Sequence, residues 1–309
     1  MLINASNNIY KKNFNFDPHP FISDGFIELN KNKVNEVVRL VEENGSGKMG
    51  LVGGITGNTF KSPFSAPFGG FHFRHNEIDV GEIESFLNLF KSYSAEKGLE
   101  KVEITLPPDI YHQSFNAKVI NSLIRTGFLM SVPEITHWVD LEHFNGVFTS
   151  GSARTKFNQA VKNGLSLHEI FDSDLKLSAY ELISQNRARF GRPIYMTFDN
   201  LMDVTKLWPV DFFRVTDKTD DMVAAAILYR GHPKIVQAIF WGDSEAGRGL
   251  RAMDLCLHHL WQHYKSLGYG FVDISTSTES GIPNEGLLKF KETHDAYSSL
   301  RFTFSWSPE

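Results

Sequence analysis

The sequence predicts an α/β protein made of two tandem halves, each with a mixed, mostly antiparallel sheet packed by a long helix. Three observations lead to this. Residues 102–104 (Val-Glu-Ile) and 272–274 (Val-Asp-Ile) place an acid between two β-branched residues, and each follows a glycine, Gly98 or Gly268, at an offset of 170 residues. An amphipathic segment precedes each glycine, and a run of small residues lies further upstream. Self-similarity at a fixed offset indicates one unit used twice.

The expected elements follow in chain order. The small-residue runs 51–56 and 223–228 predict strands, and turn sequences at 57–58 (Gly-Asn) and 230–233 (Arg-Gly-His-Pro) predict hairpins. The two long helices are predicted from apolar residues at helical spacing, which are Ile83, Phe86, Leu87, Phe90 and Tyr93 in one and Met253, Cys256, Leu257, Leu260, Tyr264 and Leu267 in the other.

The ends of the first long helix have their own signals. Asp79 with Glu82 three residues later predicts a capping box, and Gly98 suits the left-handed residue that ends a helix. Short helices are expected at 117–126 and 285–293, each followed by a last strand of its own half, at 128–139 and 299–305. Small and polar residues cluster at 145–152. We therefore expect an N-terminal domain at 1–145 and a C-terminal domain at 146–309.

Composition excludes several classes of protein. The 309 residues carry 31 basic and 36 acidic side chains, a net charge of −5, which offers no global attraction to DNA. The longest apolar run, Met222 to Tyr229, is too short for a membrane span. A single cysteine, Cys256, excludes an internal disulfide. His259 and His263 have metal-ligand spacing but lack the glutamate of a zinc-hydrolase helix, so no metal is expected. We therefore expect a cytoplasmic protein.

Three stretches carry a resemblance to known proteins. These are the basic segment 152–165, which ends in Lys-Asn-Gly-Leu, the strand 223–229 with its hairpin partner, and segment 284–295, which contains Gly-Leu-Leu-Lys-Phe-Lys. They resemble GNAT-type acyltransferases (the general control N-acetyltransferase fold), in the tandem arrangement of the Fem-type aminoacyl transferases of peptidoglycan synthesis. The sequence lacks the uninterrupted heptad pattern of the helical hairpin that tRNA-dependent members often carry.

The resemblance implies an acyl-donor site between the second hairpin and its long helix. Glycines allow close backbone approach to a phosphate, and arginines donate to it in a fork. The first-half loop from Phe71 to Ile78 has no glycine pair, so one donor site, in the second half, is expected. Its predicted residues, for acyl-CoA as donor, are Trp241, Ser244, Gly247, Arg248, Gly249 and Leu250. Asp243 and Glu245 would repel phosphate, and a plain polar turn before a helix remains the other interpretation.

Attack of an amine on an acyl donor needs a base, donors for the oxyanion and an acid for the leaving group. Asp273 is the predicted base, although the acid at the matching position Glu103 is also consistent with a structural role. Lys291, in the Phe-Lys signature, is predicted to stabilise negative charge, and Tyr297 is the predicted acid. Cys256, on an apolar helix face, is expected to be a small buried hydrophobe.

The acceptor is expected in the cleft between the halves. His72 and Arg74, from a Pro-, Gly- and Phe-rich stretch, and Arg154, from a basic helix that also carries Lys156 and Lys162, are its predicted ligands. The sequence thus predicts an N-acyltransferase that moves an acyl group from acyl-CoA to an amine, either a small molecule or a cell-wall precursor. The alternatives are a Fem-type peptidoglycan transferase that uses aminoacyl-tRNA and a catalytically inactive GNAT-like ligand-binding protein.

Overall fold

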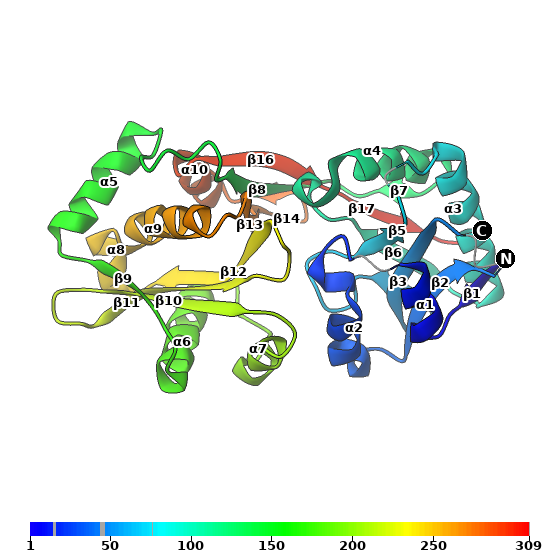
Figure 1. The fold of residues 1–309 in the computed structure, drawn as a ribbon, viewed down its shortest axis with the longest axis horizontal. Coiled ribbons are helices and arrows are strands. Elements are labelled where there is room, and N and C mark those ends of the chain that lie inside the picture. The colour runs from blue at the N-terminus through cyan, green and yellow to red at the C-terminus, as the bar shows by residue number, and fades with distance from the viewer. Residues whose placement is uncertain (15–16, 44–46, 76, 309) are drawn as a thin grey trace. The chain divides into compact units, whose positions relative to one another are not determined.

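The computed structural model describes residues 1–14, 17–43, 47–75 and 77–308. The chain divides into two compact units, residues 1–135 with 300–309 and residues 136–299 (Figure 1). Each unit is a mixed β-sheet packed by a long helix, as the sequence predicts, and further helices cover its other face. No helix in the described ranges is both long and apolar enough to cross a membrane.

The N-terminal unit is built on a sheet of order β1-β2-β3-β4-β6-β17-β7, with β5 paired to β3. Helices α3 and α4 cover one face, and α1 and α2 lie on the other (Figure 1). Its strands are β1 (Leu2–Asn4), β2 (Glu36–Glu42), β3 (Met49–Thr56), β4 (Thr59–Ser62), β5 (Gly70–Phe73), β6 (Lys101–Thr105), β7 (Leu129–Met130) and β17 (Thr303–Trp306). Its helices are α1 (Asn7–Asn13), α2 (Asp24–Asn30), α3 (Val80–Glu96) and α4 (Asp109–Arg125).

The C-terminal unit has a sheet of order β16-β8-β13-β12-β11-β10-β9, with α9 on one face and α6 on the other (Figure 1). Its strands are β8 (Glu134–Asp140), β9 (Ser166–Glu169), β10 (Val210–Thr216), β11 (Met222–Tyr229), β12 (Ile235–Asp243), β13 (Phe271–Thr276) and β16 (Ala296–Arg301), with a separate ribbon of β14 (Thr278–Glu279) and β15 (Ile282–Pro283). Its helices are α5 (Gly151–Lys162), α6 (Ser173–Arg189), α7 (Phe198–Val204), α8 (Glu245–Leu250), α9 (Ala252–Ser266) and α10 (Glu285–Thr293).

The internal repeat is confirmed at the level of strand pairing. In the first unit β3 and β4 form an antiparallel hairpin, and β4 lies parallel to β6 with Phe60 opposite Val102. In the second unit β11 and β12 form the hairpin, and β12 lies parallel to β13 with Val236 opposite Val272. The repeated residues 102 and 272 therefore occupy equivalent positions.

The long helices also form as predicted. Asp79 and Glu82 make both hydrogen bonds of the capping box at the start of α3, and α3 buries Ile83, Phe86 and Phe90. Helix α9 buries apolar residues along most of its length against the sheet, including Cys256. The short first-half helix is longer than expected, because α4 begins at Asp109 and continues through a kink at His112.

The last strands differ from the prediction. Strand β8, expected at the end of the first half, pairs with β13 of the C-terminal unit. Strand β17, expected in the second half, pairs with β6 and β7 of the N-terminal unit. Each crossing strand carries a fully buried apolar side chain, Val139 in one core and Phe304 in the other. The structural division therefore departs from the predicted boundary at 145/146, since residues 136–145 join the C-terminal unit and 300–309 the N-terminal one.

Candidate functional site

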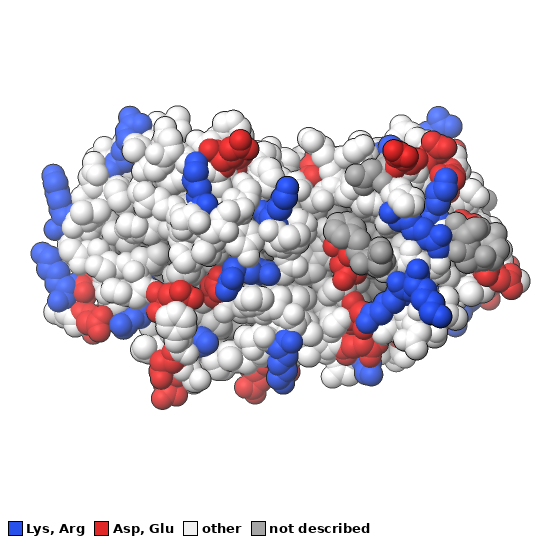
Figure 2. Space-filling model, viewed as in Figure 1, with Lys and Arg blue, Asp and Glu red and all other residues white. Residues whose placement is uncertain are grey.

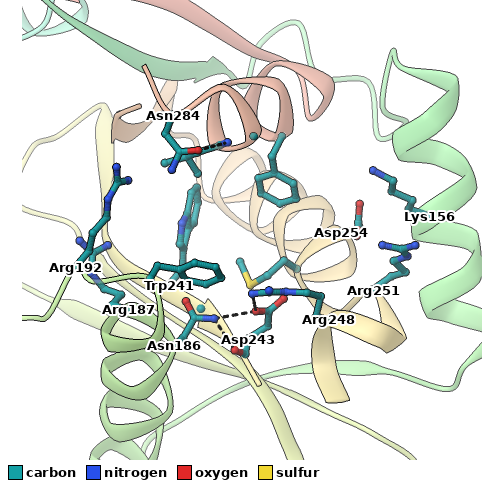
Figure 3. A pocket seen from close by; sticks show the side chains of 16 residues that line it. Lys156, Asn186, Arg187, Arg192, Trp241, Asp243, Arg248, Arg251, Asp254 and Asn284 are labelled. Carbon is teal, nitrogen blue, oxygen red and sulfur yellow. Dashed lines mark hydrogen bonds and ion pairs between the residues drawn. The ribbon is translucent and has the colours of Figure 1, made fainter. Parts of the chain in front are cut away.

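A pocket of about 540 Å³ opens in the C-terminal unit beside the end of β12 (Figure 3). Its walls come from the last turn of α6, the end of β12, the start of α9 and the first turns of α10. Helix α6 is fastened to β12 by Asn186, whose side-chain amide donates to the carbonyl oxygen of Asp243 at 2.6 Å and to its carboxylate at 2.9 Å. Gly242 permits this approach, because a Cβ there would lie 2.9 Å from the Asn186 side chain.

Basic side chains dominate this pocket. Arg187 and Arg192 lie on one side of it and Lys156 and Arg251 on the other, with Arg248 near Asp243 (Figure 3). On the face that Figure 2 draws, basic and acidic side chains occur beside one another over both units. The basic lining makes the pocket suited to an anionic ligand.

Two of the five cations already have acidic partners. Arg248 pairs with Asp243 at 3.1 Å and lies over the Phe190 ring, and Arg192 is 3.7 Å from Glu279.

The other three, Lys156, Arg187 and Arg251, make no ion pair with any residue that the structure describes. Burial, together with the neighbouring Arg192, lowers the pKa of Arg187, which indicates a guanidinium held without a counter-charge.

The predicted phosphate loop has a different local structure. Residues 245–250 form helix α8, in which Ser244 is the N-cap and its hydroxyl accepts from the Gly247 amide at 3.0 Å. The Arg248 amide donates to the Ser244 carbonyl. A Cβ at Gly247 would lie 2.1 Å from the Val223 carbonyl oxygen, so packing against β11 accounts for this glycine. Of the six predicted donor-binding residues, Trp241 and Arg248 line the pocket, whereas Ser244, Gly247, Gly249 and Leu250 do not.

Strands β12 and β13 separate beside this pocket. Their parallel pairing runs from Ile235 opposite Phe271 to Gln237 opposite Asp273, and β12 continues to Asp243 without β13 beside it. Pairing with β11 skips one residue of β12 between Ala238 and Phe240, which marks a bulge at this point.

Asp273 and Lys291 lie in the core at this separation. The Asp273 carboxylate accepts from Gln237 at 3.2 Å and from the Ser275 amide at 2.9 Å, and the residue is 1% exposed. The Lys291 ammonium donates to the carbonyls of Ser275 and Thr276, both at 2.9 Å, where Ser275 has a left-handed φ of 61°. Burial lowers the Lys291 pKa to about 7, although Asp273 acts in the opposite direction. Lys291 therefore fixes the end of β13.

The remaining predicted residues lie elsewhere. Tyr297 is half exposed, stacks on Trp138 with centroids 5.1 Å apart, and lines a separate pocket of about 360 Å³. Arg154 donates to the carbonyls of Phe148 and Thr149, which holds the segment before α5.

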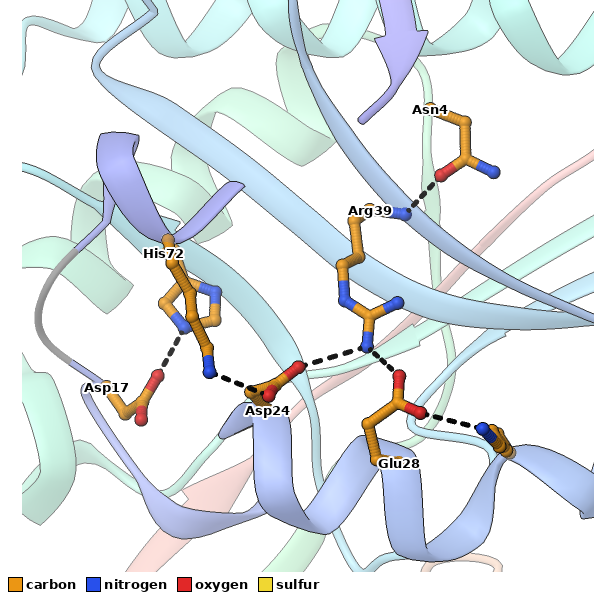
Figure 4. Close-up of polar contacts among 8 residues, drawn as sticks. Asn4, Asp17, Asp24, Glu28, Arg39 and His72 are labelled. Atoms are coloured by element: carbon orange, nitrogen blue, oxygen red, sulfur yellow. Dashed lines mark hydrogen bonds and ion pairs between the residues drawn. The ribbon is translucent and has the colours of Figure 1, made fainter. Parts of the chain in front are cut away.

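His72 and Arg74 belong to the N-terminal unit, at and just after β5 (Figure 4). The His72 ring lies between the Tyr10 hydroxyl at 3.0 Å and Asp17 at 2.9 Å, and Arg74 bonds to Asn13. Burial raises the pKa of Tyr10 well above its usual value. The contacts of His72 and Arg74 fasten α1 and Asp17 to the sheet.

Sequence reasoning missed most of the pocket. Lys156 was marked only as part of a basic helix, and Asn186, Arg187 and Asp254 were not singled out. Arg251 was noted as the second arginine of the predicted phosphate loop, and the structure gives it a left-handed φ of 67° just before α9. No group of three or more potential metal ligands gathers within the described parts of the chain.

Comparison with known proteins identifies the fold. No family model and no curated protein matches the sequence. Among solved structures, FemX has a TM-score of 0.69 at 12% identity, covering 100% of this chain and 97% of its own. The C-terminal domain of a putative lysylphosphatidylglycerol synthetase from Agrobacterium fabrum has a TM-score of 0.59 at 12% identity, covering 98% and 93%. A tandem GNAT protein from the clavulanic acid biosynthesis pathway has 0.54 at 12% identity, covering 89% and 84%. The fold is therefore GNAT-like and of the Fem type.

Proposed function

We propose that this protein is an N-acyltransferase, and that its acyl donor binds in the pocket at the end of β12. The observation that carries the proposal is the set Lys156, Arg187 and Arg251, three cations that face one pocket without acidic partners among the described residues. Unpaired charge inside a pocket is costly unless a ligand neutralises it. A phosphate-bearing carrier of an acyl group supplies that negative charge.

The geometry beside the pocket supports direct transfer of the acyl group to an amine. Beyond Gln237 no strand of the described residues pairs with β12 on the β13 side, so its backbone N–H groups on that side can donate to the donor's carbonyl oxygen. Direct attack by the amine requires no enzyme nucleophile. Cys256 fits this, because burial raises the pKa of its thiol to about 12.

Lys291 serves this reaction as a positioning residue. Its two hydrogen bonds to the carbonyls of Ser275 and Thr276 hold β13 in the conformation in which it diverges from β12. Asp273, whose carboxylate is occupied by Gln237 and the Ser275 amide, supports the same segment. Both residues therefore shape the opening along which the donor lies.

Acyl-CoA is the first candidate donor, with its phosphates held by arginines. A specific observation favours a second, aminoacyl-tRNA. The amides of Gly247 and Arg248 are bonded within the Ser244 cap and α8, so they are not free to cradle a pyrophosphate. Arginine and lysine side chains, which carry the recognition instead, suit the phosphates of an RNA 3′ end equally well. FemX and the lysylphosphatidylglycerol synthetase domain share this fold.

Ligand binding tests the proposal without knowledge of the acceptor. Thermal unfolding of the full chain is measured with coenzyme A, acetyl-CoA and a stable 3′-aminoacylamino analogue of a tRNA acceptor stem. A ligand at 100 times its Kd stabilises the protein by about 2.7 kcal/mol. Arg251→Met and Arg187→Met should each weaken binding by about 10-fold or more, whereas Lys289→Met, an exposed control on α10, should not. The absence of binding by every donor would refute the proposal.

A further inference from the structure

Besides Asp243, one further carboxylate lines the pocket among the basic groups. Asp254, at the start of α9, lines the pocket and is 6% exposed. Its Oδ1 accepts from His294 Nε2 at 3.0 Å. Within the described parts of the chain, Oδ2 has no hydrogen-bond partner and no ion pair. This oxygen of a nine-tenths buried carboxylate can therefore accept a hydrogen bond from a ligand.

The protein holds this carboxylate in a fixed position. The His294 ring, fully buried, lies between Asp254 Oδ1 and the carbonyl oxygen of Phe290, 2.6 Å from Nδ1. The backbone of His294 is held in turn, since its carbonyl accepts from the Trp261 indole at 3.1 Å. Contacts from α9 and α10 therefore orient the carboxylate of Asp254, which lines the pocket (Figure 3).

The chemistry of this oxygen defines its partner. An ionised carboxylate only accepts hydrogen bonds, so a ligand group beside it must donate. A charged donor forms a bond about twice as strong as a neutral one. Guanidinium groups of the protein are within the same pocket, yet none pairs with Asp254 among the described residues. Oδ2 is therefore suited to a compact cation with several donors.

We propose that Asp254, oriented by His294, binds a primary ammonium group of a substrate, beside the anionic groups that Lys156, Arg187 and Arg251 hold. The inference rests on the proposed function and adds a specificity determinant to it. The ammonium belongs either to the acyl group that is transferred or to the acceptor amine. Asp254 then selects substrates by one charged hydrogen-bond donor.

The experiment compares ligands that differ only in the amine. In the donor arm, S-(2-aminoethyl)-coenzyme A is compared with S-propyl-coenzyme A, and 3′-alanylamino-3′-deoxyadenosine 5′-phosphate with its 3′-propionylamino counterpart. In the acceptor arm, n-butylamine is compared with n-butanol while the amine-free donor analogue is bound. Affinities are measured by isothermal titration calorimetry on the wild-type chain, Asp254→Asn and Asp243→Asn.

We expect the amine-bearing member of one pair to bind wild-type protein about 10- to 100-fold more tightly, as for a hydrogen bond to a charged group. Asp254→Asn should remove this preference. Asp243→Asn, an acid of the same pocket already paired with Arg248, should change both members of a pair alike. The arm that shows the preference identifies the amine's source. If Asp254→Asn does not fold, the paired comparison on wild-type protein decides alone.

Equal affinity within every pair, or a preference that survives in folded Asp254→Asn, would overturn the inference and leave the proposed function standing. Failure of both donor pairs to bind wild-type protein would overturn both.

Discussion

Lys291 makes the stability of this protein depend on pH in a direction that can be calculated. The pKa of its ammonium is about 7 in the folded chain, against an ordinary value of 10.5, because burial disfavours the charged form. Between these two values the unfolded chain binds more protons than the folded one, so the free energy of unfolding rises with pH. Each pH unit well inside this window contributes up to about 1.4 kcal/mol. From pH 7 to pH 9 the gain is about 2 kcal/mol.

Replacement of Lys291 by Met isolates this effect. The variant loses two hydrogen bonds to backbone carbonyls and leaves Asp273 without its cationic neighbour, so it should be less stable than wild-type protein. The stability difference between the two should grow by about 2 kcal/mol from pH 7 to pH 9, because only wild-type protein has the lysine that titrates. Urea unfolding at each pH measures it.

The matched control is Lys289→Met, which removes an exposed lysine two residues away on the same helix. Its stability difference from wild type should stay small and flat with pH. His137 does not interfere, because burial and Lys291 lower its pKa to about 4, well below the window. A wild-type minus Lys291→Met difference that is flat or falls between pH 7 and pH 9 would refute the reasoning.

Three further predictions concern packing and charge. Gly247→Ala should destabilise the protein by about 1–3 kcal/mol in urea unfolding, because its Cβ would meet the Val223 carbonyl oxygen, whereas Gly249→Ala, which meets nothing within 4 Å, should be neutral or stabilising. Phe304→Ala should destabilise the protein by about 3–5 kcal/mol and speed amide hydrogen exchange in β6 and β7, while β10 and β11 stay protected. Loss of protection in β10 and β11 alone would contradict the pairing of β17 with the N-terminal sheet. Arg39→Met should destabilise by about 1–2 kcal/mol, because its buried guanidinium pairs with Asp24 and Glu28, whose own carboxylates are partly exposed; an unchanged urea midpoint would count against it (Figure 4).

Local sequence signals predicted the parts of the fold that depend on neighbouring residues. The apolar spacing of α3 and α9, the capping box at Asp79 and the turn at Gly57 are all properties of short segments, and all are present. The offset of 170 residues predicted equivalent strands, because the same order of elements yields the same pairing.

The placement of β8 in the C-terminal sheet and of β17 in the N-terminal sheet depends on residues far apart in the sequence, and so does the pocket. Neither could be predicted from short segments. A short apolar strand such as β17 fits either core, and only the packing of Phe304 against the N-terminal unit decides between them. The pocket gathers Lys156, Arg187, Arg251 and Asp254 from three helices and the residue before one of them. Each is an ordinary polar residue in sequence. Gly247 was predicted to let a phosphate approach the backbone, whereas its close approach to the Val223 carbonyl oxygen accounts for a glycine at this position.

The repeat also supports the proposal that the donor binds in the second half. In the N-terminal unit β4 ends at Ser62, where its pairing with β6 also ends, and the chain turns away before it returns as β5 on the Met49 to Val52 stretch of β3. In the C-terminal unit β12 passes its last pairing with β13 and continues to Asp243. The same order of strands therefore leaves no such overhang of β4 in the first half, whereas in the second half β12 extends past β13 with no paired strand on that side among the described residues. A donor that adds its own hydrogen bonds to a strand edge requires the second arrangement, and the unpaired cations lie at that end of β12.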